Sequence, residues 1–303
     1  MKGNIARQWR KLLHAGRLRR ISTLNAMTDG NISSEVVVET RPGSALAGVV
    51  VQVSTTYTAT GASNAVTGAD VFSSSLGYVK VIYPDNLDSE LNTAESIKRV
   101  AKWASISSYY ADALGNFSGS GSATYKGALA LPFTSASGYK IKVGVGSVTN
   151  AYASNVTQSV VFTIYAIDIP ADMIPRICPR LFIKETAVDS GTGLDAINRI
   201  SGHEGKGVVT IILRGTFTYL DSIRAYTPRS LYELDAPAAT LQTYHAFESL
   251  TAPSDVIVVG MDGSPFRAGM GFIVRFTSAT AYQAILVQED SEAPSPSDEK
   301  INI

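Results

Sequence analysis

The sequence contains few of the residues on which enzymes and secreted proteins usually depend. Among 303 residues there is one cysteine, Cys178, and there are three histidines. One cysteine excludes an intrachain disulfide, so the fold must rely on packing, as in a protein that folds in a reducing cytoplasm. The histidines match neither an H-E-x-x-H motif nor a paired-ligand spacing. A histidine-based metal site or general base is therefore disfavoured.

Motifs for nucleotide binding and nucleophilic catalysis are also missing. Residues 202–207 end in Gly-Lys-Gly, where a phosphate-binding loop needs Gly-Lys-Ser or Gly-Lys-Thr. No Gly-x-Ser-x-Gly elbow occurs, and Cys178 has no apparent histidine partner. We therefore expect no enzymatic activity and no cofactor.

Long apolar runs are absent as well. No uninterrupted run approaches the ~20 residues that a bilayer-spanning helix needs. Arg10 and Lys11 interrupt residues 9–13, so the N-terminus lacks the apolar region of a secretory signal. We expect neither a membrane-spanning helix nor a signal peptide.

Charge is scarce but unevenly distributed. Charged residues make up 17% of the chain and hydrophobic residues 45%, which is enough to build sizeable cores. Basic and acidic residues both number 26, so the net charge predicts no attraction to nucleic acid or membranes. The first twenty residues nevertheless hold seven basic and no acidic residues, and acidic residues crowd positions 289–299. The two ends therefore face different partners or surroundings.

The N-terminal segment predicts a basic amphipathic helix over residues 1 to about 24. Ile5, Trp9, Leu12 and Leu13 recur at helical spacing, and Gly16 interrupts the pattern. Such a helix can lie on a membrane surface or reach an anionic partner, or it can pack its apolar stripe on the domain. The first interpretation assigns the contact to Lys2, Arg7, Trp9, Arg10, Lys11, Arg17, Arg19 and Arg20.

The strongest β signals occur twice along the chain. Residues 48–60 are dense in β-branched and aromatic residues, and the pattern resumes at 77–83. Residues 207–218 resemble the first of these segments. Residues 181–186 repeat the apolar run and Glu-Thr of residues 36–40. The sequence therefore predicts two copies of one β-domain.

Short helices and loops are predicted between the strands. Residues 94–103 have helical periodicity, with Asn92 or Thr93 as the N-cap, and residues 238–250 are a second helical stretch. Small and polar residues predict loops over 61–75 and 190–207.

Closely spaced prolines mark a domain boundary. Pro170, Pro175 and Pro179 fall within ten residues, and such a cluster breaks any regular element. The predicted division is a basic arm at 1–34, a first β-domain at 35–170, a linker at 171–180, a second β-domain at 181–288, and an acidic flexible tail at 289–303.

The densest group of oxygen ligands is Asp85, Asn86, Asp88 and Glu90. A calcium ion accepts such ligands, but the spacing is not that of an EF-hand loop and no glycine forces the turn. A solvated turn followed by charges at a helix start explains the same residues. We therefore predict no metal site, and an ion at Asp85, Asp88 and Glu90 is left open.

Two β-domains without catalytic residues suit a building block better than an enzyme. Jelly rolls, which close two sheets through long connections, occur in viral capsids, lectins and cupins. A cupin needs inward histidine and carboxylate ligands, which this sequence does not supply. We predict a mainly β chain: two consecutive jelly-roll β-barrels with short helices in loops, and an N-terminal amphipathic helical arm.

The order of elements resembles the double jelly-roll major capsid proteins of tailless icosahedral viruses with an internal membrane, the tectivirus-like and corticovirus-like lineage. In that family a helical arm precedes a long strand led by glycine, and the next strand reaches a Tyr-Pro-Asp-Asn turn. This sequence has Gly48-Val-Val-Val-Gln-Val-Ser and then Val81-Ile-Tyr-Pro-Asp-Asn86. The resemblance covers the layout of residues 1 to about 290.

The resemblance implies a structural major capsid protein of a virion, such as that of a bacteriophage, made in the host cytoplasm. Three chains would form a pseudo-hexameric capsomer whose barrels stand upright over the internal membrane. The implied partners are further copies of the chain, minor capsid and vertex proteins, and anionic lipid at the arm, with nucleic acid as the alternative contact of the same cations. The alternative function is a carbohydrate-binding or adhesin-type β-sandwich module, which would need a route to the cell exterior.

Overall fold

The computed structural model describes the chain in two compact units, one up to Arg180 and one from Leu181. The described residues are 16–61, 68–103, 120–150, 155–173, 180–190, 198–200, 206–215, 220–226, 232–237, 256–260, 271–276 and 280–289. Within these ranges, no helix has both the length and the apolar character that crossing a membrane requires.

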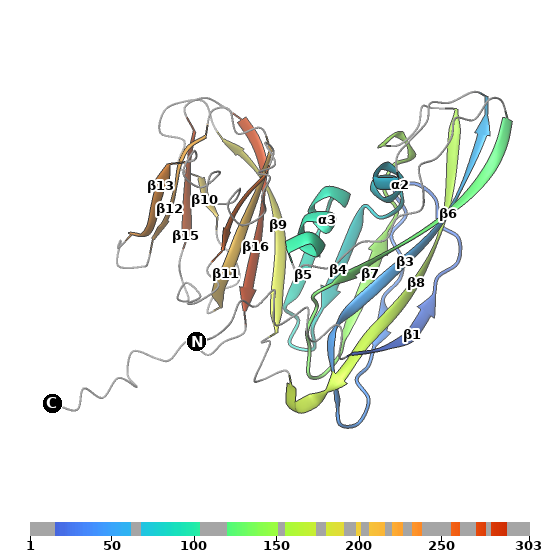
Figure 1. The fold of residues 1–303 in the computed structure, drawn as a ribbon, viewed down its shortest axis with the longest axis horizontal. Helices are drawn as coiled ribbons and strands as arrows, with labels where there is room; N and C mark the ends of the chain where they lie inside the picture. The colour runs from blue at the N-terminus through green and yellow to red at the C-terminus, as the bar shows by residue number, and fades with distance from the viewer. Residues whose placement is uncertain are drawn as a thin grey trace. The chain divides into compact units, whose positions relative to one another are not determined.

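Eight strands of the first unit lie in two antiparallel sheets (Figure 1). In one, which we call the β3 sheet, the order is β1-β8-β3-β6. Its strands are β1 (Arg17–Thr23), β8 (Val156–Pro170), β3 (Ser44–Thr60) and β6 (Ser120–Leu131). In the other, the β4 sheet, the order within this unit is β5-β4-β7-β2. Its strands are β5 (Asp88–Leu91), β4 (Tyr78–Ile82), β7 (Tyr139–Gly144) and β2 (Val36–Val38).

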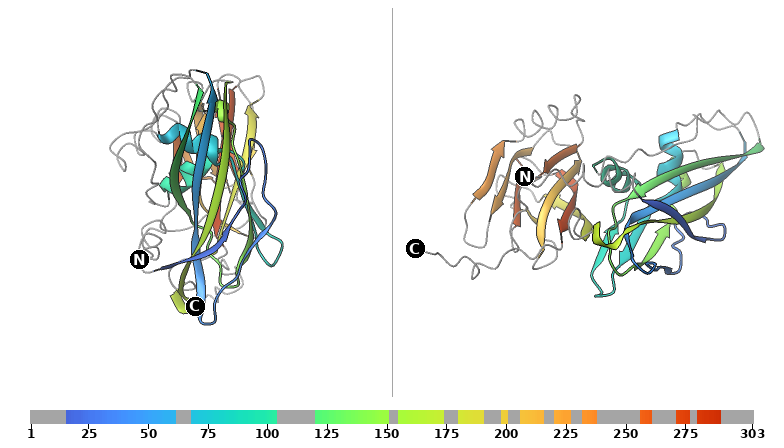
Figure 2. Two further views of the ribbon diagram at one scale, coloured as in Figure 1. Left: turned by 90° about the vertical axis from the view of Figure 1, so that its right-hand side faces the viewer. Right: turned by 60° about the horizontal axis from the view of Figure 1, so that its bottom comes forward.

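The core of the first unit lies between these sheets. In β3 the positions from Val49 to Ala59 alternate between buried and more exposed side chains, the pattern of a strand with one covered face. Val160, Phe162, Ile164 and Ala166 of β8 are likewise buried, as are the inward residues of β4 and β7. The long strands β3, β6 and β8 run side by side in Figure 2.

In the described part of this unit, two α-helices and two short 3-10 turns connect the strands. The helices are α2 (Gly68–Ser75) and α3 (Ala94–Trp103), and the turns are η1 (Val148–Asn150) and η2 (Ala171–Met173). The predicted helix over 94–103 is confirmed, and its N-cap is Thr93, whose hydroxyl accepts a hydrogen bond from the backbone N–H of Ser96. The predicted loop over 61–75 is wrong from residue 68 onward, because α2 forms there.

The second unit has the same arrangement of strands. One sheet has the order β10-β15-β12-β13, from β10 (Asn198–Ile200), β15 (Gly271–Phe276), β12 (Leu220–Tyr226) and β13 (Tyr232–Pro237). The other has the order β14-β11-β16-β9 within this unit, from β14 (Val256–Gly260), β11 (Gly207–Gly215), β16 (Thr280–Glu289) and β9 (Leu181–Ser190). Its buried residues include Ile211, Leu213 and Ile285.

Each strand of the first unit corresponds to the strand eight numbers later in the second. The order β1-β8-β3-β6 becomes β9-β16-β11-β14, and β2-β7-β4-β5 becomes β10-β15-β12-β13. Eight antiparallel strands in two sheets with these long crossovers form a jelly roll. The prediction of two consecutive jelly rolls is therefore confirmed. The predicted helix over 238–250 and the tail beyond residue 289 lie outside the described residues.

The duplication corrects one predicted correspondence. Residues 181–186 belong to β9, which matches β1 and not the segment 36–40 around β2. The likeness between residues 207–218 and 48–60 was correctly aligned, because β11 and β3 occupy the same place. Short apolar runs with Glu-Thr are too common in strands to identify a position. The segment predicted as a loop over 190–207 also contains a short strand, β10.

The N-terminal prediction was wrong over residues 17–23. These residues form β1, which pairs antiparallel with β8 from Arg17 with Asp168 to Thr23 with Thr163. Residues 17–23 of the predicted arm are therefore a strand of the β3 sheet. Pairing with a long central strand satisfies the backbone of β1, and this tertiary contact outweighs the helical spacing of the apolar residues. Residues 1–15 lie outside the described residues.

Candidate interaction surfaces

The eight residues predicted to contact a lipid or nucleic-acid partner fall into two groups. Lys2, Arg7, Trp9, Arg10 and Lys11 lie outside the described residues. Arg17, Arg19 and Arg20 lie on β1, an edge strand of the β3 sheet. The structure therefore places three of the predicted cations on a strand, and their roles differ.

Arg19 belongs to the fold and not to a free cationic surface. Its Nε and one terminal nitrogen donate to the two carboxylate oxygens of Asp168, at 2.6 and 2.8 Å. Its Nη2 also donates to the backbone carbonyl of Glu39, at 2.7 Å. The hydrogen bond to Asp168 raises the pKa of Arg19. This paired geometry is the strong form of an arginine–carboxylate contact, so Arg19 fastens β1 to β8 and to the segment after β2.

Arg17 and Arg20 are exposed on the same strand. Within the described residues neither has an ion-pair partner, although Arg20 donates to the hydroxyl of Thr23 at 2.6 Å. Leu18, which lies between Arg17 and Arg19, is 65% exposed. β1 therefore presents two cations and one large apolar side chain to its surroundings.

The acidic side chains at residues 85–90 contact two different basic residues. Asp85 pairs with Arg180 at 2.6 Å, and Arg180 also lies 5.1 Å from the centre of the Tyr83 ring. The ion pair with Arg180 contributes to a lowered pKa of Asp85, against the opposing effect of its burial. Asp88 and Glu90 both contact Lys80. No group of three or more metal-ligating side chains occurs within the described residues.

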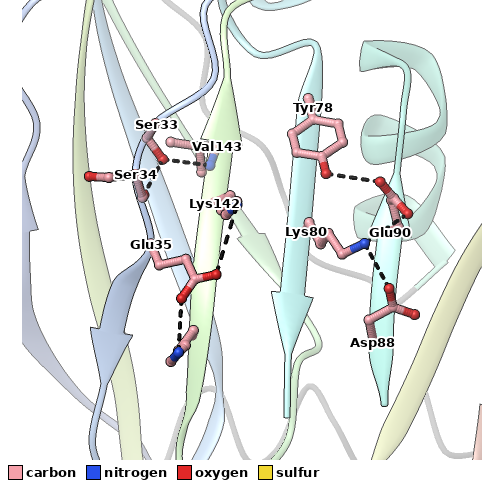
Figure 3. A network of polar contacts seen from close by, with 10 residues as sticks. Ser33, Ser34, Glu35, Tyr78, Lys80, Asp88, Glu90, Lys142 and Val143 are labelled. Carbon is pink, nitrogen blue, oxygen red and sulfur yellow. Dashed lines mark hydrogen bonds and ion pairs between the residues drawn. The ribbon is translucent and has the colours of Figure 1, made fainter. Parts of the chain in front are cut away.

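The outer face of the β4 sheet carries a row of alternating charge groups (Figure 3). Glu35 pairs with Lys140 at 2.9 Å and lies 3.8 Å from Lys142. Two strands away, Lys80 pairs with Asp88 at 2.8 Å and with Glu90 at 3.3 Å. Lys80 and Lys142 stand opposite each other in the register, so acids on both sides offset their repulsion.

Tyr78 completes this row. Its hydroxyl donates to Glu90 at 2.9 Å. Burial, followed by this hydrogen bond to a carboxylate, raises the pKa of Tyr78 to about 12. The tyrosine therefore remains neutral at any physiological pH, and the face as a whole is a self-compensated charged surface that suits contact with water.

The three long strands of the β3 sheet have an outer surface of the opposite character, next to the exposed Arg20 of β1. We call it the uncharged face, and it consists of the outward positions of β3, β8 and β6. Lys126 is the one charged residue at these positions, which are Val50, Gln52, Ser54, Thr56, Thr58 and Thr60; Thr157, Ser159, Val161, Thr163 and Tyr165; and Ser120, Ser122, Thr124, Lys126 and Ala128. Thr56 and Thr124 share a hydrogen bond of 2.8 Å across two strands, and Tyr165 donates to Gln52 at 3.2 Å.

We did not predict the uncharged face from the sequence, although its alternating pattern of uncharged residues is present there. Residues 50–60 alternate buried positions with Val, Gln, Ser and Thr, and no acidic or basic residue interrupts them. A solvated sheet face usually carries charges, and depletion of charge is the compositional mark of a contact surface. No catalytic or ligand motif accompanies this pattern, so it does not stand out in a search for chemistry.

A scan of protein-family models and a search of curated proteins found no match. Solved structures do match. The major capsid protein of Sulfolobus turreted icosahedral virus aligns with 90% of this chain and 96% of its own, at 12% identity and a TM-score of 0.64. The major capsid protein of bacteriophage PM2 aligns with 90% of this chain and 97% of its own, at 10% identity and a TM-score of 0.51. This chain therefore has the double jelly-roll fold that these two capsid proteins share.

Proposed function

We propose that the protein is the major capsid subunit of an icosahedral virion, with three copies forming one pseudo-hexameric capsomer. The observation that carries the proposal is the repeated strand order: the chain contains two jelly rolls of the same topology. Three such chains supply six similar barrels, which fill six near-equivalent positions around a threefold axis. Likeness to two capsid proteins over 90% of the chain supports this function over the adhesin alternative.

The contrast between the two outer faces supports self-association. The β4 sheet carries compensated charges, whereas the uncharged face has one lysine across three long strands. A protein–protein interface is depleted in charged residues at its centre. We propose that the uncharged face is buried in the capsid. The charged face is proposed to stay in contact with water.

Sedimentation of the purified full chain tests the proposal. We expect a species with three times the mass of the chain, or a larger assembly built from it, at micromolar concentration. An obligate subunit with interfaces of this class buries large areas, so dissociation to the monomer is expected only at high dilution or in denaturant. A strictly monomeric species at high concentration would contradict a capsid role.

The basic residues at the N-terminus are proposed to contact the anionic lipid of an internal membrane. Besides Arg19, which is paired with Asp168, residues 1–20 hold six cations and Trp9, the composition of a segment that binds an anionic surface. Packaged nucleic acid is the other polyanion that would attract the same cations. Minor capsid and vertex proteins complete the proposed partners, and the proposed location is the virion capsid after synthesis in the host cytoplasm. The chain is proposed to be structural and not an enzyme.

A truncation that removes residues 1–15 is expected to abolish flotation with anionic vesicles and leave the fold intact. A truncation through residue 24 is a poor test, because it also removes β1 and the Arg19–Asp168 contact. The measurement is co-flotation with phosphatidylserine vesicles, with neutral phosphatidylcholine vesicles as the control. Undiminished flotation of the shortened chain would contradict the lipid role, and retained binding to DNA but not to vesicles would assign the arm to nucleic acid.

A further inference from the structure

The register of the β3 sheet places four side chains together at one end of its outer surface. Arg20 of β1, Tyr165 of β8 and Val50 of β3 lie directly opposite one another on adjacent strands. Leu18 lies two positions before Arg20 and therefore on the same side of β1. Directly opposite residues of antiparallel strands have Cβ atoms about 5 Å apart, so these side chains form one contiguous group. We call Leu18, Arg20, Val50 and Tyr165 the anchor patch.

The anchor patch contains the residue types that dominate protein–protein contacts. Leu18 is 65% exposed, the highest value among the large hydrophobic residues of the described chain. Arg20 is also exposed, and Val50 and Tyr165 are partly buried. Tyrosine and arginine are enriched at interfaces and among the residues that contribute most to binding. An exposed leucine gains free energy when a partner covers it, so the patch is suited to be buried.

The surface that contains the anchor patch is large enough for a specific interface. It includes the uncharged face, which runs along β3 from residue 50 to residue 60. At ~3.3 Å per residue and ~4.8 Å between strands, this length of the three long strands has an area of roughly 500 Å². A specific interface buries about 800 Å² on each partner, so this surface and the adjoining β1 supply most of one side.

The charges on the outer side of the β3 sheet are all positive. Arg20 lies on β1 at one edge, and Lys126 lies on β6 at the other. No acidic side chain occupies an outward position of these four strands, all of which the structure describes. A second copy of the same surface therefore offers no carboxylate to either cation, whereas a different surface of the chain can. Charge complementarity thus favours a contact between unlike surfaces, the heterologous type that can close into a ring.

We infer that the anchor patch of one copy docks on a second copy of the chain through a heterologous contact that buries Leu18 and Tyr165. Arg20 lies at the margin of this contact and faces a carboxylate of the second copy. Three such contacts close a ring of three chains, so every copy uses its anchor patch once. The inference rests on the proposed function and goes beyond it, because it assigns the residues and the type of contact that join the copies within one capsomer.

Leu18→Asp tests the contact in the full-length chain. Because Leu18 is exposed in the single chain, the substitution should leave the fold intact, but in the contact it buries a carboxylate in place of an apolar side chain. We expect the association constant from sedimentation equilibrium to fall at least about tenfold, and Tyr165→Ala to lower it by a similar factor. Leu18→Met keeps the apolar character and the approximate volume, so its association is expected to stay close to that of the wild type.

Ile32→Asp and Val37→Asp are matched controls for the added charge. Both residues are apolar and exposed, at 54% and 55%. Both lie beside β7 of the β4 sheet, where Ile32 bridges to Gly144 and Val37 belongs to the neighbouring strand β2. Each control adds the same carboxylate as Leu18→Asp at a similar exposure, and we expect it to leave association unchanged. Thermal unfolding should show all the variants to be folded.

Arg20→Glu tests the charged margin of the contact separately. The new carboxylate would face the carboxylate of the second copy, so association is expected to weaken more than in Arg20→Ala. Salt screens this repulsion, and the loss caused by Arg20→Glu should therefore be smaller at high than at low ionic strength. A loss that is the same at both ionic strengths would contradict the assignment of a carboxylate opposite Arg20.

The outcomes distinguish this inference from the proposed function. Loss of association in Leu18→Asp and Tyr165→Ala, with normal association in both controls, supports the contact. Normal trimers in Leu18→Asp, or an equal loss in Leu18→Asp and Ile32→Asp, would overturn the contact and leave the capsid role standing. A wild-type chain that remains monomeric at all concentrations would overturn both.

Discussion

Replacing Arg19 with alanine is expected to lower the free energy of unfolding by about 2–3 kcal/mol. The side chain of Asp168 is only 8% exposed, and both of its oxygens accept hydrogen bonds from Arg19. Within the described residues, the other ion-pair partner of Asp168 is Arg41, which is 4.0 Å away and largely exposed. The substitution also removes the donor to the carbonyl of Glu39. Urea unfolding followed by circular dichroism measures the loss.

Matched variants on the same strand sharpen this test. Arg17→Ala and Arg20→Ala remove exposed cations of the same type and are expected to change the unfolding free energy by less than about 0.5 kcal/mol. Arg19→Lys keeps the charge without the paired geometry, so its loss should be intermediate. Combining Arg19→Ala with Asp168→Ala should cost less than the sum of the single losses. Equal effects of Arg19→Ala and Arg20→Ala would show that the buried contact does not hold β1.

Replacing Gln158 with glutamate is expected to destabilise the first jelly roll by about 3 kcal/mol near neutral pH. Gln158 is 4% exposed, and its Nε2 lies 2.8 Å from Asp29 Oδ1, 2.9 Å from the carbonyl of Ser74 and 3.2 Å from that of Gly146. All three neighbours are acceptors, so the amide nitrogen must face them. Glutamate has the same size but replaces this donor with a second carboxylate beside Asp29.

The pH dependence gives this prediction a distinctive signature. Burial and the carboxylate of Asp29 raise the pKa of the introduced carboxyl above its unfolded value of about 4.3. Because this carboxyl has a higher pKa in the folded state than in the unfolded state, the loss in unfolding free energy is largest at pH values above the folded-state pKa. The loss decreases as the pH falls through the folded-state pKa towards the unfolded-state pKa. Gln52→Glu on the uncharged face is the control, because the new carboxylate still accepts from Tyr165 and is partly solvated. A loss that does not change with pH would contradict the mechanism.

The sequence predicted correctly those elements whose structure depends mainly on residues close together in the chain. The helix at 94–103 has a capping residue and a periodic apolar stripe, and the strand signal at 48–60 lies within β3. The duplication was visible because β3 and β11 both contain dense runs of β-branched residues. These features need no knowledge of distant residues.

The parts that the sequence did not reveal depend on distant residues. Residues 17–23 fit a basic amphipathic helix locally, and their pairing with β8, about 145 residues later, makes them a strand. Arg19 was grouped with the other cations because its carboxylate partner, Asp168, is equally remote. Asp85, Asp88 and Glu90 are adjacent in sequence, yet Arg180 and Lys80 neutralise them separately.

Images of the purified assembly test the central claim, that two like barrels per chain form a pseudo-hexameric capsomer. Class averages from electron microscopy of the particle viewed down its symmetry axis should show six similar lobes related by threefold symmetry, because three chains each contribute two barrels of the same topology. Particles with two lobes, or assemblies with no threefold axis, would contradict the account.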